Sequence, residues 1–180
     1  GGDLDIFETS LSDVDGLSNV SSARTVSIWS NEALVNIDGL VGLSSVENYV
    51  SLDNNDVLLN LDGLSNLNSV DGLIVSGNDD LADIDGISGL TSSSYIQIAN
   101  NASIINVNGL SGLSSLSGNM YIANNSSLSD ISGISQLVFI GGDLSITKNA
   151  SLCQTDAEAI AAAIVVTGTT TVSDNTGNWP

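Results

Sequence analysis

The feature that most constrains this chain is a row of residues that recurs almost from one end to the other. In one row, Ile98 has an apolar residue two positions before it, Asn101 three after it, and apolar residues six, nine, twelve and fifteen after it. The position of Ile98 recurs in steps of 24, 23, 23, 24 and 24 residues, at Ile28, Leu52, Val75, Ile122 and Ile146. A fixed period in this range predicts a solenoid, in which each row buries its apolar side only against its neighbours.

The spacing predicts one solenoid domain over residues 1–180, with repeat rows in 1–152 and a C-terminal helix, last strand and cap in 153–180. We expect seven to eight rows of 23–24 residues and a mostly β fold, a right-handed parallel β-solenoid. In the tail, residues 156–166 are expected to form a short helix that Thr155 or Asp156 starts, and 169–173 a last strand.

Each row opens with a short alternating strand, as at residues 26–29, where Val26 and Ile28 point inward and Ser27 and Trp29 outward. Three residues after each strand centre comes an Asn whose amide is expected to satisfy buried backbone groups at the corner. This Asn ladder consists of Asn31, Asn55, Asn78, Asn101, Asn125, Asn149 and Asn175. Glycosylation sequons at three ladder positions should therefore be inaccessible, which leaves Asn19 and Asn124 as candidate acceptors.

A Gly follows later in most rows, usually after Asp, and we interpret it as a turn that requires positive φ. The turn carboxylates could share Ca²⁺ between stacked rows, although none forms a dedicated calcium loop and turn formation alone explains them. These candidate metal ligands are Asp15, Asp38, Asp62, Asp83 and Asp85. A second acidic group that could serve the same purpose is Glu32, Asp53, Asp56, Asp79 and Asp80. No cofactor is required by the sequence.

The charge balance limits the classes of partner. The chain holds 21 Asp and Glu against two basic residues, a net charge of −19, which argues against nucleic acid and anionic membrane as partners. There is no apolar run long enough for direct membrane insertion and one Cys, so no internal disulfide. We expect an extracellular or cell-surface protein whose signal peptide has been removed. The absence of His removes the commonest general base, so we expect no enzyme.

Two surfaces are candidates for association. Outward positions of the sheet carry Trp29, Tyr49, Asp53, Tyr95 and Tyr121, residue types that suit a glycan or a protein ligand, or merely cover the sheet. The first row begins directly on a strand, so Leu4, Ile6, Leu11 and Val14 should form an apolar end; Trp179 lies at the other end. These chain ends predict self-association, or contact with neighbouring domains of a longer chain that would cover the first row.

The row Ile96-x-Ile98-x-x-Asn101-x-x-Ile104-x-x-Val107-x-Gly109-Leu110-x-x-Leu113, with the tail from Leu152-Cys153, resembles leucine-rich repeats of the receptor L-domain kind found in microbial surface proteins. The resemblance implies ligand binding through the sheet face or loops, although this chain lacks the disulfides of receptor versions. Our leading hypothesis is a structural or adhesive surface protein that stacks head-to-tail into a filament. The alternative is a ligand- or glycan-binding module of a cell-surface receptor or adhesin.

Overall fold

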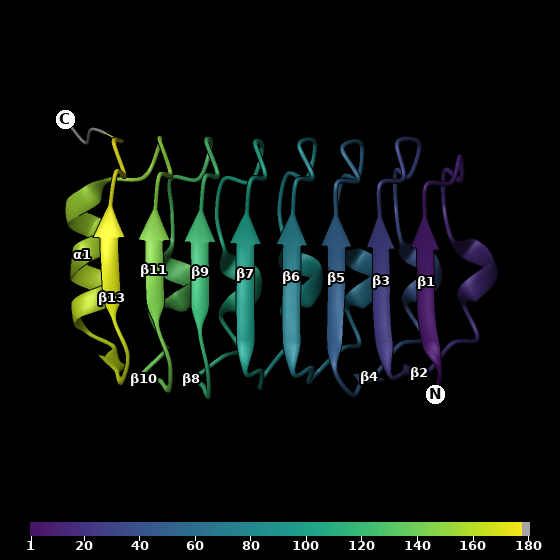
Figure 1. Ribbon diagram of the computed structural model, residues 1–180, viewed down its shortest axis with the longest axis horizontal. Helices are drawn as coiled ribbons and strands as arrows, with labels where there is room; N and C mark the ends of the chain where they lie inside the picture. The colour runs from purple at the N-terminus through teal and green to yellow at the C-terminus, as the bar shows by residue number, and fades with distance from the viewer. Residues whose placement is uncertain (178–180) are drawn as a thin grey trace.

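A single eight-stranded parallel sheet organises the protein, whose computed structural model describes residues 1–177. The strands follow one another across the sheet in chain order, and we number rows one to eight by them: β1 (Asp3–Phe7), β3 (Thr25–Trp29), β5 (Tyr49–Asp53), β6 (Gly72–Ser76), β7 (Tyr95–Ala99), β9 (Met120–Ala123), β11 (Leu144–Thr147) and β13 (Thr170–Ser173). Figure 1 shows them side by side from the N-terminal to the C-terminal end.

Each row returns behind the sheet before the next strand begins. Six rows carry one 3-10 turn on this return leg: η1 (Asp15–Leu17), η2 (Asp38–Leu40), η3 (Asp62–Leu64), η4 (Asp85–Ile87), η5 (Asn108–Leu110) and η6 (Ser132–Ile134). The strands run upward in Figure 1 while the chain descends behind them and steps to the left, which makes the winding right-handed. The predicted right-handed parallel β-solenoid is confirmed, with eight rows.

Short strands mark the corner where the return leg meets the next strand. They pair in two small parallel sheets, which are β2 (Ser22–Ala23) with β4 (Ser45–Val46), and β8 (Ser115–Leu116) with β10 (Phe139–Ile140) and β12 (Val165–Val166). In rows four and five this corner has only an isolated bridge between Ser69 and Ser92.

The core lies between the sheet and the return legs. The repeat positions pair in register, Ile6 with Ile28, Ile28 with Leu52, and onward to Ile146 with Val172. From Ile28 to Ile146 these side chains are fully buried, as are those of Leu34, Leu58, Leu81 and Ile104 at the position six residues further on. Stacking therefore gives each inner row apolar contacts on both sides.

The expectation that the turn glycines need positive φ is wrong. They lie inside the 3-10 turns, and the only glycine with positive φ in residues 1–177 is Gly77. What these positions require is space, because a methyl group on Gly39 or Gly63 would overlap a carbonyl oxygen of the preceding row. The left-handed conformation instead falls just before the ladder position in every row, at Glu8, Ser30, Asn54, Gly77, Asn100, Asn124, Lys148 and Asp174.

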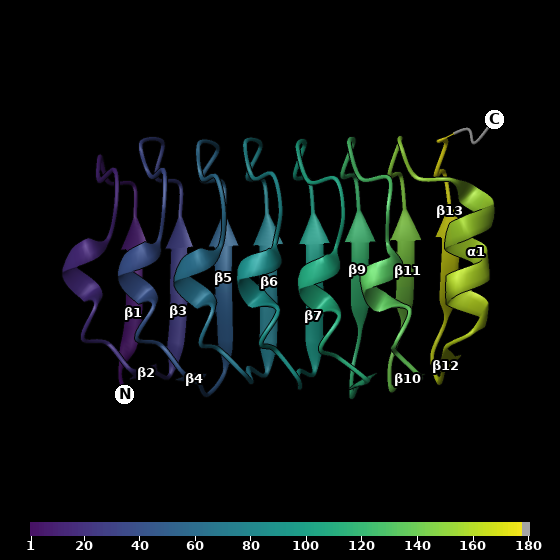
Figure 2. The ribbon, with the colours of Figure 1, turned by 180° about the vertical axis from the view of Figure 1, so that it is seen from behind.

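The C-terminal helix α1 (Gln154–Ala162) begins and ends earlier than the expected 156–166. Its N-cap is Cys153, and Val165 and Val166 form β12 because their backbone continues the corner sheet beside β10. Figure 2, which views the protein from the side of the return legs, shows α1 in front of β13, on the side of the sheet where earlier rows carry a 3-10 turn. Within residues 1–177, no helix is both long and apolar enough to cross a membrane.

Candidate ligand-binding face

The outer face of the eight-stranded sheet gathers most of the aromatic side chains. Alternation along each strand sends these residues away from the core, and the register places them in three columns along the solenoid. The chain has two Trp, three Tyr and two Phe, and five of these seven lie on this face. They are Phe7, Trp29, Tyr49, Tyr95 and Tyr121.

Phe7 is a member of this face that our sequence reasoning missed. Phe7 pairs with Trp29 across β1 and β3, and the two rings stack with centroids 4.8 Å apart and planes 6° from parallel. Both side chains remain exposed, Phe7 at 49% and Trp29 at 36%. The signal was present, because Phe7 follows Ile6 as Trp29 follows Ile28, but row one is shorter than the others.

The three tyrosines lie over the middle of the sheet. Gly72 lies between Tyr49 and Tyr95 in one column and is buried, because these two neighbouring side chains cover it. The Tyr95 and Tyr121 rings are tilted, with centroids 5.7 Å apart. The Tyr95 hydroxyl donates to Gln97 at 2.6 Å, and partial burial, together with Tyr121, raises the pKa of Tyr95. Tyr95 thus contacts both Gln97 and Tyr121 at the middle of the sheet.

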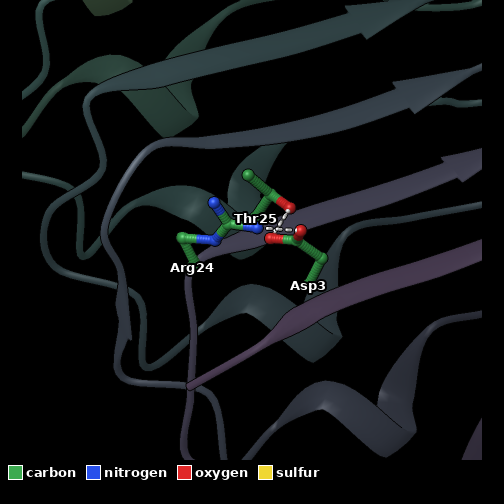
Figure 3. A network of polar contacts seen from close by, with 3 residues as sticks. All are labelled: Asp3, Arg24 and Thr25. Carbon is green, nitrogen blue, oxygen red and sulfur yellow. Dashed lines mark hydrogen bonds and ion pairs between the residues drawn. The ribbon is translucent and has the colours of Figure 1, made fainter.

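Polar groups interleave with the rings. Asp53, expected on this face, is half-buried beside Trp29 in the register and accepts a hydrogen bond from the Ser51 hydroxyl. Thr25, at the start of β3, is buried, and its hydroxyl donates to Asp3 at 2.7 Å. This donation, with the neighbouring guanidinium of Arg24, lowers the pKa of Asp3 (Figure 3). One of the two basic residues is thus paired with a carboxylate at the edge of the face.

The predicted Asn ladder is present and buried. The backbone N–H of Asn78 donates to the Asn101 side-chain oxygen at 3.0 Å, and the Asn78 amide donates to the Leu52 carbonyl at 2.9 Å. All seven predicted members are buried: Asn31, Asn55, Asn78, Asn101, Asn125, Asn149 and Asn175. The acceptor side chains of the sequons at Asn101, Asn125 and Asn149 are therefore buried and hydrogen-bonded within the ladder, whereas Asn19 and Asn124 are exposed.

The ladder is closed at both ends by other residue types. In row one, Thr9 takes the ladder position and donates both its N–H and its hydroxyl to Asn31. At the other end, the Gln154 side-chain oxygen of α1 accepts the N–H and the amide of Asn175, both at 3.2 Å. Helix α1 thereby supplies the acceptor that a further row would provide.

The candidate metal ligands lie in the turns rather than around a common point. Asp83 accepts the backbone N–H of Asp85 at 3.0 Å, and Asp15, Asp38, Asp62 and Asp85 each begin a 3-10 turn and are exposed. Within residues 1–177, no three Cys, Asp or Glu side chains are grouped so as to hold a metal ion. Calcium binding stays a prediction.

Row one is only partly covered at its outer side. Leu4 and Ile6 are half-buried and Leu11 is exposed, as expected for an apolar end. Val14 differs, because it is buried and belongs to the hydrophobic core. Trp179, assigned to the opposite end, lies outside the described residues.

Cys153 is buried, and its sulfur lies 3.1 Å from the Thr155 hydroxyl. That hydroxyl, followed by the backbone of Asp156, lowers the pKa of the Cys153 thiol. The negative charge of the neighbouring Asp156 acts in the opposite direction and raises the pKa of this thiol, but it is outweighed by these hydrogen bonds. A lowered thiol pKa is typical of a Cys at the N-terminus of a helix, and Cys153 is the N-cap of α1.

No known protein family matches this chain, and no curated protein sequence is significantly similar to it.

Proposed function

We propose that this protein is a non-enzymatic, extracellular binding module of the leucine-rich-repeat kind that holds a neutral glycan on the outer face of its sheet. The observation that carries the proposal is the concentration of Phe7, Trp29, Tyr49, Tyr95 and Tyr121 on one face. Aromatic rings with polar partners present flat apolar area beside hydrogen-bonding groups, and a sugar ring offers the same two kinds of surface.

The size and charge of the face favour a linear, uncharged ligand. The aromatic residues extend from β1 to β9 across six neighbouring strands, which at ~4.8 Å per strand is about 24 Å, the length of several sugar units. The overall charge of −19 disfavours acidic sugars, and Ser27, Ser51 and Gln97 provide neutral donors and acceptors between the rings.

Binding of neutral hexasaccharides, of β-linked glucose and of N-acetylglucosamine, tests the proposal by isothermal titration calorimetry. Trp29→Ala and Tyr121→Ala should each weaken binding at least about tenfold, or about 1.4 kcal/mol, because each removes a stacking surface. Phe139→Ala is the matched control, since Phe139 is an exposed aromatic residue at the corner strand β10, away from this face. Equal binding by all three variants, or no binding by the unmodified protein, would contradict the proposal.

Head-to-tail assembly is the second candidate. It is supported by the partial exposure of Leu4 and Ile6 and the exposure of Leu11 at row one. Closure of the ladder by Gln154 makes the opposite end less receptive to a further row, which is why we place ligand binding first.

A further inference from the structure

A second apolar surface lies on the return legs, away from the sheet face. Val35, Leu59, Ala82 and Ile105 occupy the same position in rows two to five, and we refer to these four residues as the ridge. Val35, Leu59 and Ile105 are 39%, 47% and 55% exposed, and Ala82 is also exposed. The backbone holds them in line, because the N–H of Leu59 donates to Val35 at 3.0 Å and that of Ala82 to Leu59 at 3.3 Å.

Carboxylates run along both sides of the ridge. Three residues before it in rows two to four stand Glu32, Asp56 and Asp79, and three residues after it stand Asp38, Asp62 and Asp85. All six side chains are exposed. The chain leg that carries them connects the loops after the strands to the 3-10 turns, on the side seen in Figure 2.

Rows five and six depart from the pattern of rows two to four. In row five the ridge residue Ile105 is apolar, but the two flanking positions are Ala102 and Asn108. In row six the ridge position is Ser129, and the two flanking positions are Ser126 and Ser132, all three exposed. A row can therefore fold with Ser at all three of these exposed positions. Rows two to four combine an exposed apolar residue with two carboxylates, a pattern that folding of a row does not require.

We infer that the ridge docks an amphipathic helix of a partner protein whose apolar stripe is flanked by Lys or Arg. Charge complementarity selects this occupant, because six carboxylates flank the ridge in rows two to four and a partner with acidic flanks would be repelled. A second copy of this chain would bring its own carboxylates against these carboxylates, and the two would repel each other. A helix also fits the spacing, since its turns repeat every 5.4 Å and the rows about every 4.8 Å. The four rows span about 14 Å, or roughly ten helical residues.

The test is fluorescence anisotropy with a labelled synthetic peptide of about fourteen residues, made of Leu and Lys with Leu on one helical face. A peptide of the same composition with Leu spread around the helix serves as the comparison. In buffer that contains EDTA, we expect the patterned peptide to bind at least about tenfold more tightly than the comparison peptide. Leu59→Ser and Ile105→Ser should each remove most of that difference, and these variants should fold because Ser129 already occupies this position in row six.

Val165→Ser is the control variant, because Val165 is 63% exposed but lies at the corner strand β12. It should bind the patterned peptide as the unmodified protein does. Equal affinity for the two peptides, or unchanged binding by Leu59→Ser, would mean that only the overall negative charge attracts Lys and would overturn the inference. Glycan binding by the sheet face should be unaffected in Leu59→Ser, so the two proposals fail separately.

Discussion

At the scale of single residues, the Asn ladder provides hydrogen bonds to buried backbone groups, which apolar packing cannot provide. Each ladder side chain accepts hydrogen bonds from the preceding row and donates to a strand carbonyl of that row, so buried backbone groups at the corner are satisfied in the interior. Among residues 1–177, no buried side-chain polar atom lacks a partner. Since an unpaired buried polar group is costly, the ladder sets how well the rows stack.

Asn101→Ala is expected to lower the free energy of unfolding by roughly 2–4 kcal/mol. It removes the acceptor of the Asn78 N–H and the donor to the Val75 carbonyl, and both groups lie in the interior. Urea denaturation followed by circular dichroism measures the change. Asn68→Ala is the control, since Asn68 is exposed and only its backbone carbonyl is used, by Thr91. Similar losses in the two variants would argue against a special role for the ladder.

At the scale of elements, the 3-10 turns decide how closely the return legs approach one another. Gly63→Ala should destabilise the protein by about 1–3 kcal/mol or more, because its methyl group would overlap the Ile37 carbonyl of the preceding row. Gly16 occupies the same position in row one, where nothing lies within 4 Å of an added methyl group. Gly16→Ala should therefore change the free energy of unfolding by no more than about 0.5 kcal/mol. Urea denaturation of both variants gives the comparison, and equal losses would point to backbone conformation as the reason for glycine.

The elements that the sequence predicts well are those that repeat with the rows. Ile28, Leu52, Val75 and Ile98 identify their strands and the register between them, because each position recurs at nearly constant spacing. The role of Gly39 and its equivalents was misread, since the repeat shows where glycine stands but not whether φ or a neighbouring row requires it. The repeat pattern does not show which atoms of neighbouring rows touch, so the contact between Gly39 and the Val14 carbonyl could not be predicted from it.

The candidate surfaces show the same division. The aromatic side chains of β3, β5, β7 and β9 follow from strand alternation, and Phe7 was missed because row one is shortened. The ridge escaped sequence reasoning because an apolar residue directly after Leu34 or Leu58 reads as part of the core. Only the observed burial separates inward Leu58 from outward Leu59.

At the scale of the whole molecule, a net charge of −19 affects the three proposed associations in different ways. Salt screens charges over a Debye length of ~8 Å at 0.15 M and ~3 Å at 1 M. A neutral glycan on the sheet face should bind with little dependence on salt, whereas a cationic helix on the ridge should bind more weakly as salt rises. Contact between two copies should strengthen, because their mutual repulsion is screened. Salt dependence therefore distinguishes the three.

If row one mediates self-association, sedimentation velocity should show larger species as NaCl is raised from about 0.05 M to 1 M, since Leu4, Ile6 and Leu11 then meet another copy with less repulsion. Electron microscopy of the same samples would show fibres if the contact is heterologous and does not close. Leu11→Ser should reduce the assembly, because Leu11 is exposed at this end. Ile105→Ser, at an exposed apolar position in row five and away from both ends, should leave the assembly intact. Monomers at every salt concentration would rule out head-to-tail assembly by the chain alone and leave the sheet face and the ridge as the surfaces through which it acts.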